Sequence, residues 1–452
     1  MTELNLNKKL LPTPYLKNGR ICASHLVCAF LLSSIYRKSM FIKISYFSYT
    51  EPLYPIRTLL MRTAIVKIIT LTFSILIIVT LFGCNSKNKE SIKDTKRVTS
   101  QNVLSVVIDS INSDINNGDY GLIDRFMVIR NDELLADYKY EQDYETMAQK
   151  YDTVNHQFNF NSTDWHPYYK QTELHTLQSV TKSITSILLG IALDLNGDYN
   201  VSNKAMPLLT GYNTDFQDKQ KQNISIEDLL TMRSGLQWNE ETDHNDTTND
   251  CFRLESSDNW IEYVLSKPMD TIPGTKFVYN GGATVLLGKI VRTITGKRID
   301  DWAEEKLFEP LGITDYYWKE TPYGEIDTEG GLYLKAEDLA KIGILFLNKG
   351  KWNDKQIVSE SWVNTSTSPL IKDVKPEWRR DMGYGYQWWI PEYTNKGESS
   401  IYAGNGYGGQ YLMMAPEYNL IIIFNGWNIN DEPEKSTWRV LQDRIIPTLK
   451  NK

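Results

Sequence analysis

The chain has 452 residues, of which 41% are apolar and 12% aromatic, with ordinary amounts of glycine and proline. This composition excludes a collagen, a low-complexity polymer and a wholly disordered chain, and the length predicts two subdomains rather than one core. Residues 1–84 carry ten Lys/Arg and two Asp/Glu, a charge of +8, so the rest holds 39 and 54, a charge of −15. Because an acidic surface repels a polyanion, we expect no nucleic-acid partner.

The positions of the cysteines and histidines exclude several kinds of structural and catalytic site. Three of the four cysteines lie within the first 84 residues, and only Cys251 follows them. One cysteine can form neither an internal disulfide nor a Cys₄ or Cys₂His₂ metal site. The last histidine is His244, and the chain has no Gly-x-Ser-x-Gly segment, which argues against a Ser–Asp–His triad in hydrolase order. We therefore expect no metal ion and no other cofactor.

The front of the chain has the pattern of a targeting segment. Met61 opens a short basic stretch, an uncharged apolar run covers 68–82, and Leu-Phe-Gly-Cys ends at Cys84. Residues 61–84 thus read as a lipoprotein signal peptide, because the run is short and its end resembles a bacterial lipobox with Cys84 as the lipidated residue. The alternative is an uncleaved N-terminal membrane anchor. Either way we expect the rest of the chain outside the cytoplasm, in the cell envelope and attached to a membrane.

Two segments border this signal. Residues 1–60 form an upstream extension of uncertain role: either Met61 is the true start, or the extension is a real cytoplasmic segment. Residues 85–100 are polar and charged, which predicts a solvated tether between the lipid and the domain at 101–452.

Periodicity predicts strands near both ends of this domain and helices between them. The predicted helices cover 103–115, 179–195, 226–232, 260–265, 283–295, 299–307, 336–347 and 436–449. The predicted strands cover 126–129, 134–140, 386–390, 410–414 and 420–424. We therefore expect an α+β fold in which both ends build one antiparallel sheet flanked by helices, with a mainly helical domain inserted at about 198–325.

Ser179-Val180-Thr181-Lys182 is the sharpest chemical feature. The i, i+3 spacing at the start of an apolar helix puts Ser179 and Lys182 on one face. A serine hydroxyl needs a base beside it to act as a nucleophile, and a lysine can serve if its pKa is lowered by burial and nearby cations. The alternative is an N-cap serine with a solvated lysine. Ser86 and Lys89 repeat the Ser-x-x-Lys spacing without an apolar helix.

The residues around this motif resemble the serine β-lactamase and penicillin-binding superfamily, in particular its class-C-like serine hydrolases. The resemblance covers roughly 120–450. Its anchors are Ser179 to Lys182, Ile226 to Leu236, Pro273 to Asn280, Leu286 to Gly288, Glu309 to Gly312, Gly330 to Leu332 and Tyr384 to Trp389. The resemblance implies that Ser179 is the nucleophile and that Lys182 and Tyr279 shuttle its proton, the lysine ammonium stabilising the tyrosine phenolate.

Two anchors depart from the family pattern. Where the family often has Tyr-x-Asn, this chain has Gly281 after Tyr279 and Asn280, which resembles the amide-hydrolase and esterase branch. Where β-lactamases have Lys-Thr-Gly, it has Gly404-Asn405-Gly406, the expected substrate-binding strand. The missing amide and the missing cation leave the usual substrate contacts in doubt. The resemblance further implies an oxyanion hole formed by the backbone N–H groups of Ser179 and Tyr407.

These inferences together predict an envelope-anchored serine hydrolase that cleaves an ester or amide bond of a small molecule or a peptide through an acyl-enzyme on Ser179. The alternative is a non-catalytic β-lactamase-like protein that binds cell-wall peptides or partner proteins. The intact set of Ser179, Lys182 and Tyr279 favours the enzyme.

Overall fold

The computed structural model describes residues 91–148, 172–243, 246–372, 374, 382–391, 400–429 and 433–450. The upstream extension, the signal segment with Cys84 and the first residues of the predicted tether lie outside these ranges. None of the helices within them combines the length and the apolar character needed to cross a bilayer.

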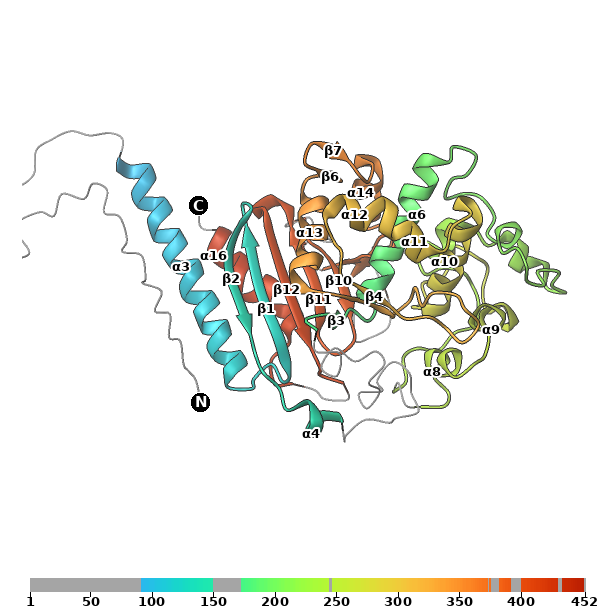
Figure 1. The fold of residues 1–452 in the computed structure, drawn as a ribbon, viewed down its shortest axis with the longest axis horizontal. Helices are drawn as coiled ribbons and strands as arrows, with labels where there is room; N and C mark the ends of the chain where they lie inside the picture. Colours follow the sequence, from blue (N-terminus) through green and yellow to red (C-terminus); the bar gives the residue numbers. More distant parts are fainter. Residues whose placement is uncertain are drawn as a thin grey trace, which may run out of the picture. The chain divides into compact units, whose positions relative to one another are not determined.

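A seven-stranded antiparallel sheet joins the two ends of the domain (Figure 1). Its strands, in spatial order, are β2 (Glu133–Lys139), β1 (Ile123–Arg130), β12 (Leu420–Gly426), β11 (Gln410–Ala415), β10 (Tyr402–Gly406), β9 (Trp389–Ile390) and β8 (Gly383–Tyr384). In the central pair, Val128 of β1 lies opposite Ile422 of β12, nearly three hundred residues later in the chain. This arrangement confirms the predicted α+β fold.

The two faces of the sheet bury different cores. Ile422 and Phe424 of β12 belong to the core shared with α3 (Ser91–Asn116) and α16 (Ile446–Lys450), the helices on the outer face in Figure 1. Ile421 and Ile423 point the other way, into a larger core, because side chains alternate along a strand.

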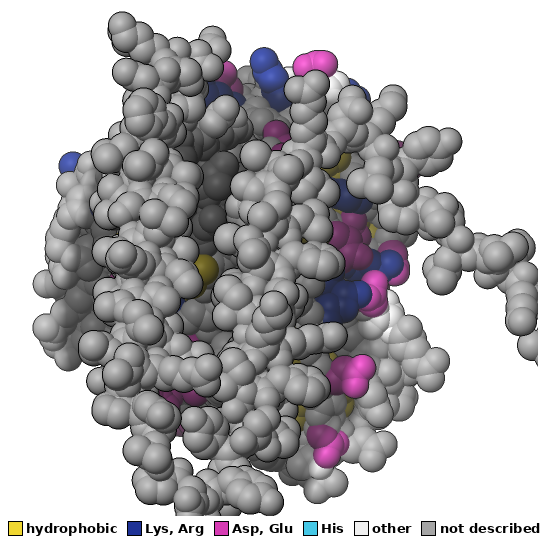
Figure 2. Space-filling view, turned by 90° about the vertical axis from the view of Figure 1, so that its left-hand side faces the viewer, with side chains coloured by type: hydrophobic (Ala, Val, Ile, Leu, Met, Phe, Trp, Pro, Cys, Tyr) yellow, Lys and Arg dark blue, Asp and Glu magenta, His cyan; other side chains and the backbone are white. Residues whose placement is uncertain are grey.

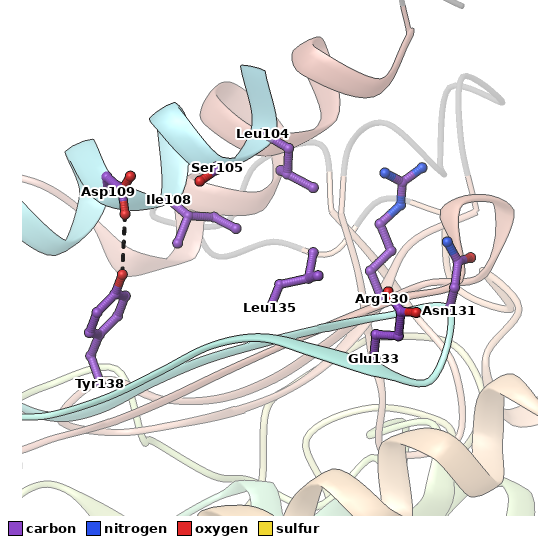
Figure 3. A pocket seen from close by; sticks show the side chains of 9 residues that line it. All are labelled: Leu104, Ser105, Ile108, Asp109, Arg130, Asn131, Glu133, Leu135 and Tyr138. Carbon is purple, nitrogen blue, oxygen red and sulfur yellow. Dashed lines mark hydrogen bonds between the residues drawn. The ribbon is translucent and has the colours of Figure 1, made fainter. Parts of the chain in front are cut away.

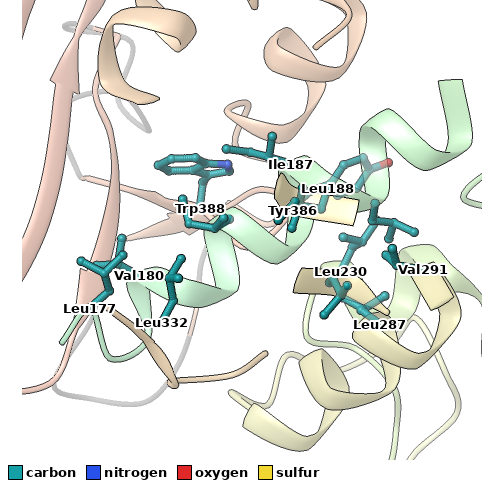
Figure 4. Close-up of a cluster of buried hydrophobic side chains, with 14 of the residues drawn as sticks. Leu177, Val180, Ile187, Leu188, Leu230, Leu287, Val291, Leu332, Tyr386 and Trp388 are labelled. Atoms are coloured by element: carbon teal, nitrogen blue, oxygen red, sulfur yellow. The ribbon is translucent and has the colours of Figure 1, made fainter. Parts of the chain in front are cut away.

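The larger core runs without a break from the sheet into the helical insertion. It takes in α6 (Val180–Leu195), α7 (Ile226–Leu230), α9 (Trp260–Ser266), α10 (Gly281–Thr295) and α13 (Ala336–Leu347). Figure 4 shows Ile187 and Leu188 of α6 among these side chains, close to Trp388. The helices of the insertion and the inner face of the sheet thus share one core, while the outer face of the sheet buries the other.

Shorter elements complete the domain. They are α4 (Tyr144–Ala148), α8 (Asp250–Glu255), α11 (Ile299–Ala303), α12 (Glu309–Leu311), α14 (Glu360–Ser366), and the small sheets β3 (His175–Thr176), β5 (Leu332–Leu334), β4 (Tyr317–Trp318) and β6 (Lys351–Trp352), β7 (Lys355–Gln356).

Three elements differ from their predicted bounds. Helix α3 begins at Ser91, so most of the predicted tether 85–100 is helical rather than irregular. The expected strand 386–390 is reduced to β9, and the expected C-terminal helix opens with a 3₁₀ turn at Thr437–Arg439 and a π-helical turn at Val440–Ile445 before α16. The C-terminal difference covers Thr437–Ile445, most of the predicted helix, and so exceeds the one or two residues by which helix ends usually vary.

Candidate active site

Ser179 stands at the start of α6, on a strained turn that follows β3. Gln178, just before it, has φ = 47°, a left-handed conformation that costs a non-glycine residue free energy. Ser179 itself has φ = −64° and ψ = −5°, and its side chain makes no capping hydrogen bond to the helix. Ser179 thus stands at the N-cap position without capping the helix through its side chain, and its half-buried hydroxyl is available for another role.

Lys182 meets that hydroxyl one turn along the helix. Its ammonium donates to Ser179 Oγ at 2.9 Å, to the backbone oxygen of Glu329 at 2.8 Å and to Glu329 Oε2 at 2.6 Å. The side chain is 1% exposed, so the alternative of a solvated lysine is wrong. Three acceptors match the three N–H bonds of an ammonium group.

The charge on Lys182 departs from the sequence-based expectation. Burial by itself lowers the pKa of Lys182, but the Glu329 carboxylate, with smaller contributions from Tyr279, Glu240 and Cys251, raises it well above its ordinary value. The expectation of a lowered lysine pKa rested on burial and on nearby cations; the lysine is buried, but the structure places carboxylates beside it instead of cations. Lys182 is thus held as a cation, which stabilises a neighbouring anion better than it accepts a proton.

Tyr279 lies on the other side of Lys182. The lysine Nζ is 5.3 Å from the centroid of the tyrosine ring, and the ring stacks on Trp389 with 5.5 Å between centroids. Asn280, next in the chain, caps α10 by accepting the N–H of Ala283 at 2.9 Å. The structure thus brings Ser179, Lys182 and Tyr279 together, and the asparagine of this segment serves the helix.

Strand β10, which holds the predicted substrate-binding residues, packs closely against the turn that carries Ser179. A Cβ on Gly404 would lie 2.9 Å from Val180 Cγ1, and one on Gly406 would lie 2.3 Å from the backbone oxygen of Leu177. The glycines of β10 therefore let the strand pack against both sides of the Ser179 turn. Asn405, between them, is 8% exposed, and Tyr407 follows at the end of the strand. Its pairing with Ser179 as an oxyanion hole stays a prediction.

Sequence analysis did not identify three residues that surround the Lys182 ammonium, namely Glu329, Cys251 and Glu240. Cys251 donates to Glu329 Oε1 at 3.4 Å, and Glu240 Oε2 accepts the N–H groups of Gly281 and Trp238, each at 2.7 Å. Burial, together with repulsion from Glu329, raises the pKa of Glu240 to about 7. One signal was present in the sequence, since Glu329 directly precedes the Gly330-Gly331-Leu332 anchor.

This cluster also resembles a metal site in composition. Glu240, Cys251 and Glu329 bring possible ligand atoms within 4.8 Å of one another. The Lys182 ammonium, however, already lies 2.6 Å from Glu329 Oε2 and balances its charge. The donor set therefore fits a lysine counter-ion better than a metal ion.

A separate cavity of about 380 Å³ lies between α3 and the hairpin of β1 and β2 (Figure 3). Leu104 and Ile108 of the helix face Leu135 of the hairpin across it. Its lining includes none of the candidate site residues.

Figure 2 shows a face on which the described lysine, arginine and acidic side chains lie close to one another. The ion pair Arg125–Asp137 joins β1 to β2.

Comparisons with known proteins agree with this geometry. The family model described as beta-lactamase matches residues 129–442. The N-acetylmuramyl-L-alanine amidase of Bacillus subtilis (strain 168) is 24% identical over 299 residues, which are 56% of this chain and 67% of that protein. The 6-aminohexanoate-dimer hydrolase of Paenarthrobacter ureafaciens is 24% identical over 345 residues, 72% of this chain and 76% of the relative.

Solved structures show the same fold. A putative 6-aminohexanoate-dimer hydrolase from Bacillus anthracis superposes with a TM-score of 0.56 at 20% identity, covering 74% of this chain and 79% of that chain. A putative beta-lactamase from Bacteroides dorei gives a TM-score of 0.55 at 17% identity, covering 77% and 99%. The matched segment holds the Ser179 turn, the Lys182 cluster and all strands of the main sheet except most of β1. The chain belongs to the beta-lactamase family of serine hydrolases.

Proposed function

We propose that the protein hydrolyses a neutral ester or amide through an acyl-enzyme on Ser179. The observation that carries this proposal is the 2.9 Å contact between Ser179 Oγ and the fully buried ammonium of Lys182. A surface serine and lysine have no reason to be held together in this way, because burying a lysine costs free energy.

The charges of the site suggest how the proton moves. Ser179 Oγ attacks the carbonyl carbon, and its proton passes to the phenolate of Tyr279, which the Lys182 ammonium stabilises. Tyr279 then protonates the leaving group, and Lys182 keeps its own proton while its charge stabilises the anions that form beside it. The N–H groups of Ser179 and Tyr407 stabilise the oxyanion, and water releases the acyl group.

The relatives support an ester or amide bond as the scissile bond. Two of them are an N-acetylmuramyl-L-alanine amidase and a 6-aminohexanoate-dimer hydrolase, and a third is a lovastatin esterase of Penicillium rubens, 28% identical over 159 residues. A neutral acyl group suits this chain, since Gly404 stands where β-lactamases carry a lysine for the substrate carboxylate.

Pre-steady-state kinetics with a p-nitrophenyl acyl ester test the proposal. We expect a burst of p-nitrophenol that approaches the enzyme concentration, because an activated ester acylates the serine faster than water releases the acyl group. Ser179→Ala should show no burst, and Ser266→Ala, which removes a hydroxyl at the exposed end of α9, should behave as wild type. A wild-type enzyme that releases no p-nitrophenol would contradict catalysis and favour a binding protein.

We further propose that the enzyme is a lipoprotein of the cell envelope, with Cys84 as the lipidated mature N-terminus. The support is Leu-Phe-Gly-Cys directly after the apolar run 68–82. Metabolic fatty-acid labelling should mark the wild type and not Cys84→Ala. A mature protein that retains residues 1–60 would contradict this proposal.

A further inference from the structure

Glu329 is a buried carboxylate that the sequence-based account left without a role. It is 1% exposed, and it precedes β5 in a turn fixed by Asp327, whose Oδ1 accepts the N–H groups of Glu329 at 3.2 Å and Gly330 at 3.0 Å. Its side chain reaches Lys182 through Oε2 and receives the thiol of Cys251 at Oε1. Both carboxylate oxygens are therefore engaged, and the group has one defined orientation.

The carboxylate occupies space that a side chain at position 281 would need. A Cβ built on Gly281 would lie 2.8 Å from Glu329 Oε2, 3.2 Å from Glu329 Cδ and 3.3 Å from Glu240 Oε2. Carboxylate tips can often swing away from such a contact, but here Lys182 and Cys251 hold Glu329 in place. Gly281 is thus the residue that the position of Glu329 requires.

We propose that Glu329 is a positioning residue for the nucleophile, whose carboxylate fills the space above Gly281 and holds the Lys182 ammonium against Ser179 Oγ. The proposal rests on the proposed function, since it assumes that Ser179 reacts. The proposal also explains why position 281 holds glycine where the family often has the asparagine of Tyr-x-Asn. Glu329, from another segment of the chain, supplies a polar group in the space of that side chain.

The charge of Lys182 then depends on Glu329. The titratable groups around the lysine are Glu329, Tyr279, Glu240 and Cys251, and the Glu329 carboxylate is the largest of their effects that keep the pKa of Lys182 high. Without that carboxylate, burial dominates and the lysine loses its proton at lower pH. A site that needs the ammonium would therefore fail first on the alkaline side.

The first test compares pH profiles of kcat for a neutral p-nitrophenyl ester. In Glu329→Gln we expect kcat at pH 8 to fall roughly ten- to a hundredfold, with little change in KM, because a charge-assisted contact is lost. We expect the alkaline limb of the profile to move down by about one pH unit or more. Glu329→Asp, which keeps the charge, should recover part of the rate and the wild-type limb.

Glu325→Gln is the matched control. Glu325 lies four residues earlier and pairs with Lys289 at 3.2 Å and Arg292 at 3.0 Å, away from the site. Its variant should keep the wild-type pH profile. A Glu329→Gln enzyme with an unchanged profile, or with faster turnover at neutral pH, would overturn the proposal.

The second test starts from Gly281→Ala, a substitution that itself changes no charge. Gly281→Ala should lower kcat by pushing the carboxylate away from Lys182, while in a Glu329→Ala background the same substitution should cost little more, because the contact is gone. Equal costs in the two backgrounds would overturn the proposal. If Glu329→Gln fails to fold, Gly281→Ala alone, read by its pH profile, still decides.

Fluorophosphonate labelling separates this proposal from the proposed function. If Ser179 is the nucleophile, Ser179→Ala does not label, while Glu329→Gln labels at the same residue but more slowly. Labelling of Ser179→Ala would refute the function, whereas wild-type labelling rates in Glu329→Gln across pH 6–9 would refute the role of Glu329 alone.

Discussion

Gly281 and Gly404 stand at two positions where the resembling enzymes carry polar side chains, but their surroundings differ. Beside Gly281 the space is taken by the carboxylates of Glu329 and Glu240, whereas beside Gly404 it is taken by Val180 and Ser183. At position 281 carboxylates stand where the family has an amide side chain, and we call these surroundings of Gly281 the charged wall. At position 404, where the family has a cation, a strand packs against a helix, and we call these surroundings of Gly404 the neutral wall.

This difference shows that a glycine in a motif does not by itself mean a lost function. At position 281 the polar group has moved to another segment, and Lys182 keeps a partner. At position 404 the three atoms nearest to an added Cβ belong to Val180 and Ser183, and none of them carries a charge. We therefore expect charged groups around Ser179 and a neutral strand on the side where the substrate is proposed to bind.

The largest expected effect comes from removing the cation on the charged wall. Lys182→Met should lower the free energy of unfolding by about 3–5 kcal/mol, because it leaves the Glu329 carboxylate buried without its counter-charge. Adding Glu329→Leu should return part of that loss. Urea unfolding measures both, with Lys335→Met, which removes a partly exposed pair with Asp315, as the control. A loss below about 1 kcal/mol for Lys182→Met would contradict a buried, balanced pair.

The neutral wall predicts the substrate preference. Nitrocefin carries a carboxylate, and its kcat/KM should be lower than that of a neutral p-nitrophenyl ester by about ten- to a hundredfold, the worth of a charge-assisted hydrogen bond. The sequence offers two other cations that could attract a substrate carboxylate, Arg379 and Arg380, and both lie outside the described residues. Efficient nitrocefin turnover, with the ester equal or slower, would contradict this preference and would show that another segment of the chain supplies a cation to the site.

Close packing on the neutral wall predicts a stability effect. Gly406→Ala should cost about 1–3 kcal/mol, because its Cβ would meet the backbone oxygen of Leu177 at 2.3 Å. Gly404→Ala should cost less, since its nearest atom, at 2.9 Å, belongs to a side chain. Gly197→Ala is the control because nothing lies within 4 Å of its added Cβ. Thermal unfolding of the three variants checks the order, and equal costs would refute it.

A smaller effect should follow from Glu240. Its pKa is raised to about 7, so between pH 5 and 8 the folded state holds a proton that the unfolded state has released. Stability therefore falls as pH rises through this window. Glu240→Gln should gain about 2 kcal/mol on wild type between pH 5 and pH 8, measured by urea unfolding. A constant difference across this range would contradict the raised pKa.

Local patterns predicted the helix of Ser179 and five of the seven strands of the main sheet, because apolar spacing is visible in neighbouring residues. Strand β10 was indicated only by the resemblance to the family, since Tyr-Ala-Gly-Asn-Gly lacks the apolar alternation of a strand and forms one between β9 and β11. Glu329 was missed because it lies 147 residues from Lys182. The charge of the lysine followed from that distant contact and could not be read from the motif.

The position of the covalent adduct tests the central claim most directly. After reaction with a fluorophosphonate, intact-mass analysis and peptide mapping should show one adduct, on the peptide that contains Ser179. The peptide with Ser86, where Ser-x-x-Lys recurs, should stay unmodified, and Ser179→Ala should gain no mass. An adduct that persists in Ser179→Ala, or that maps to another residue of the wild type, would contradict the account.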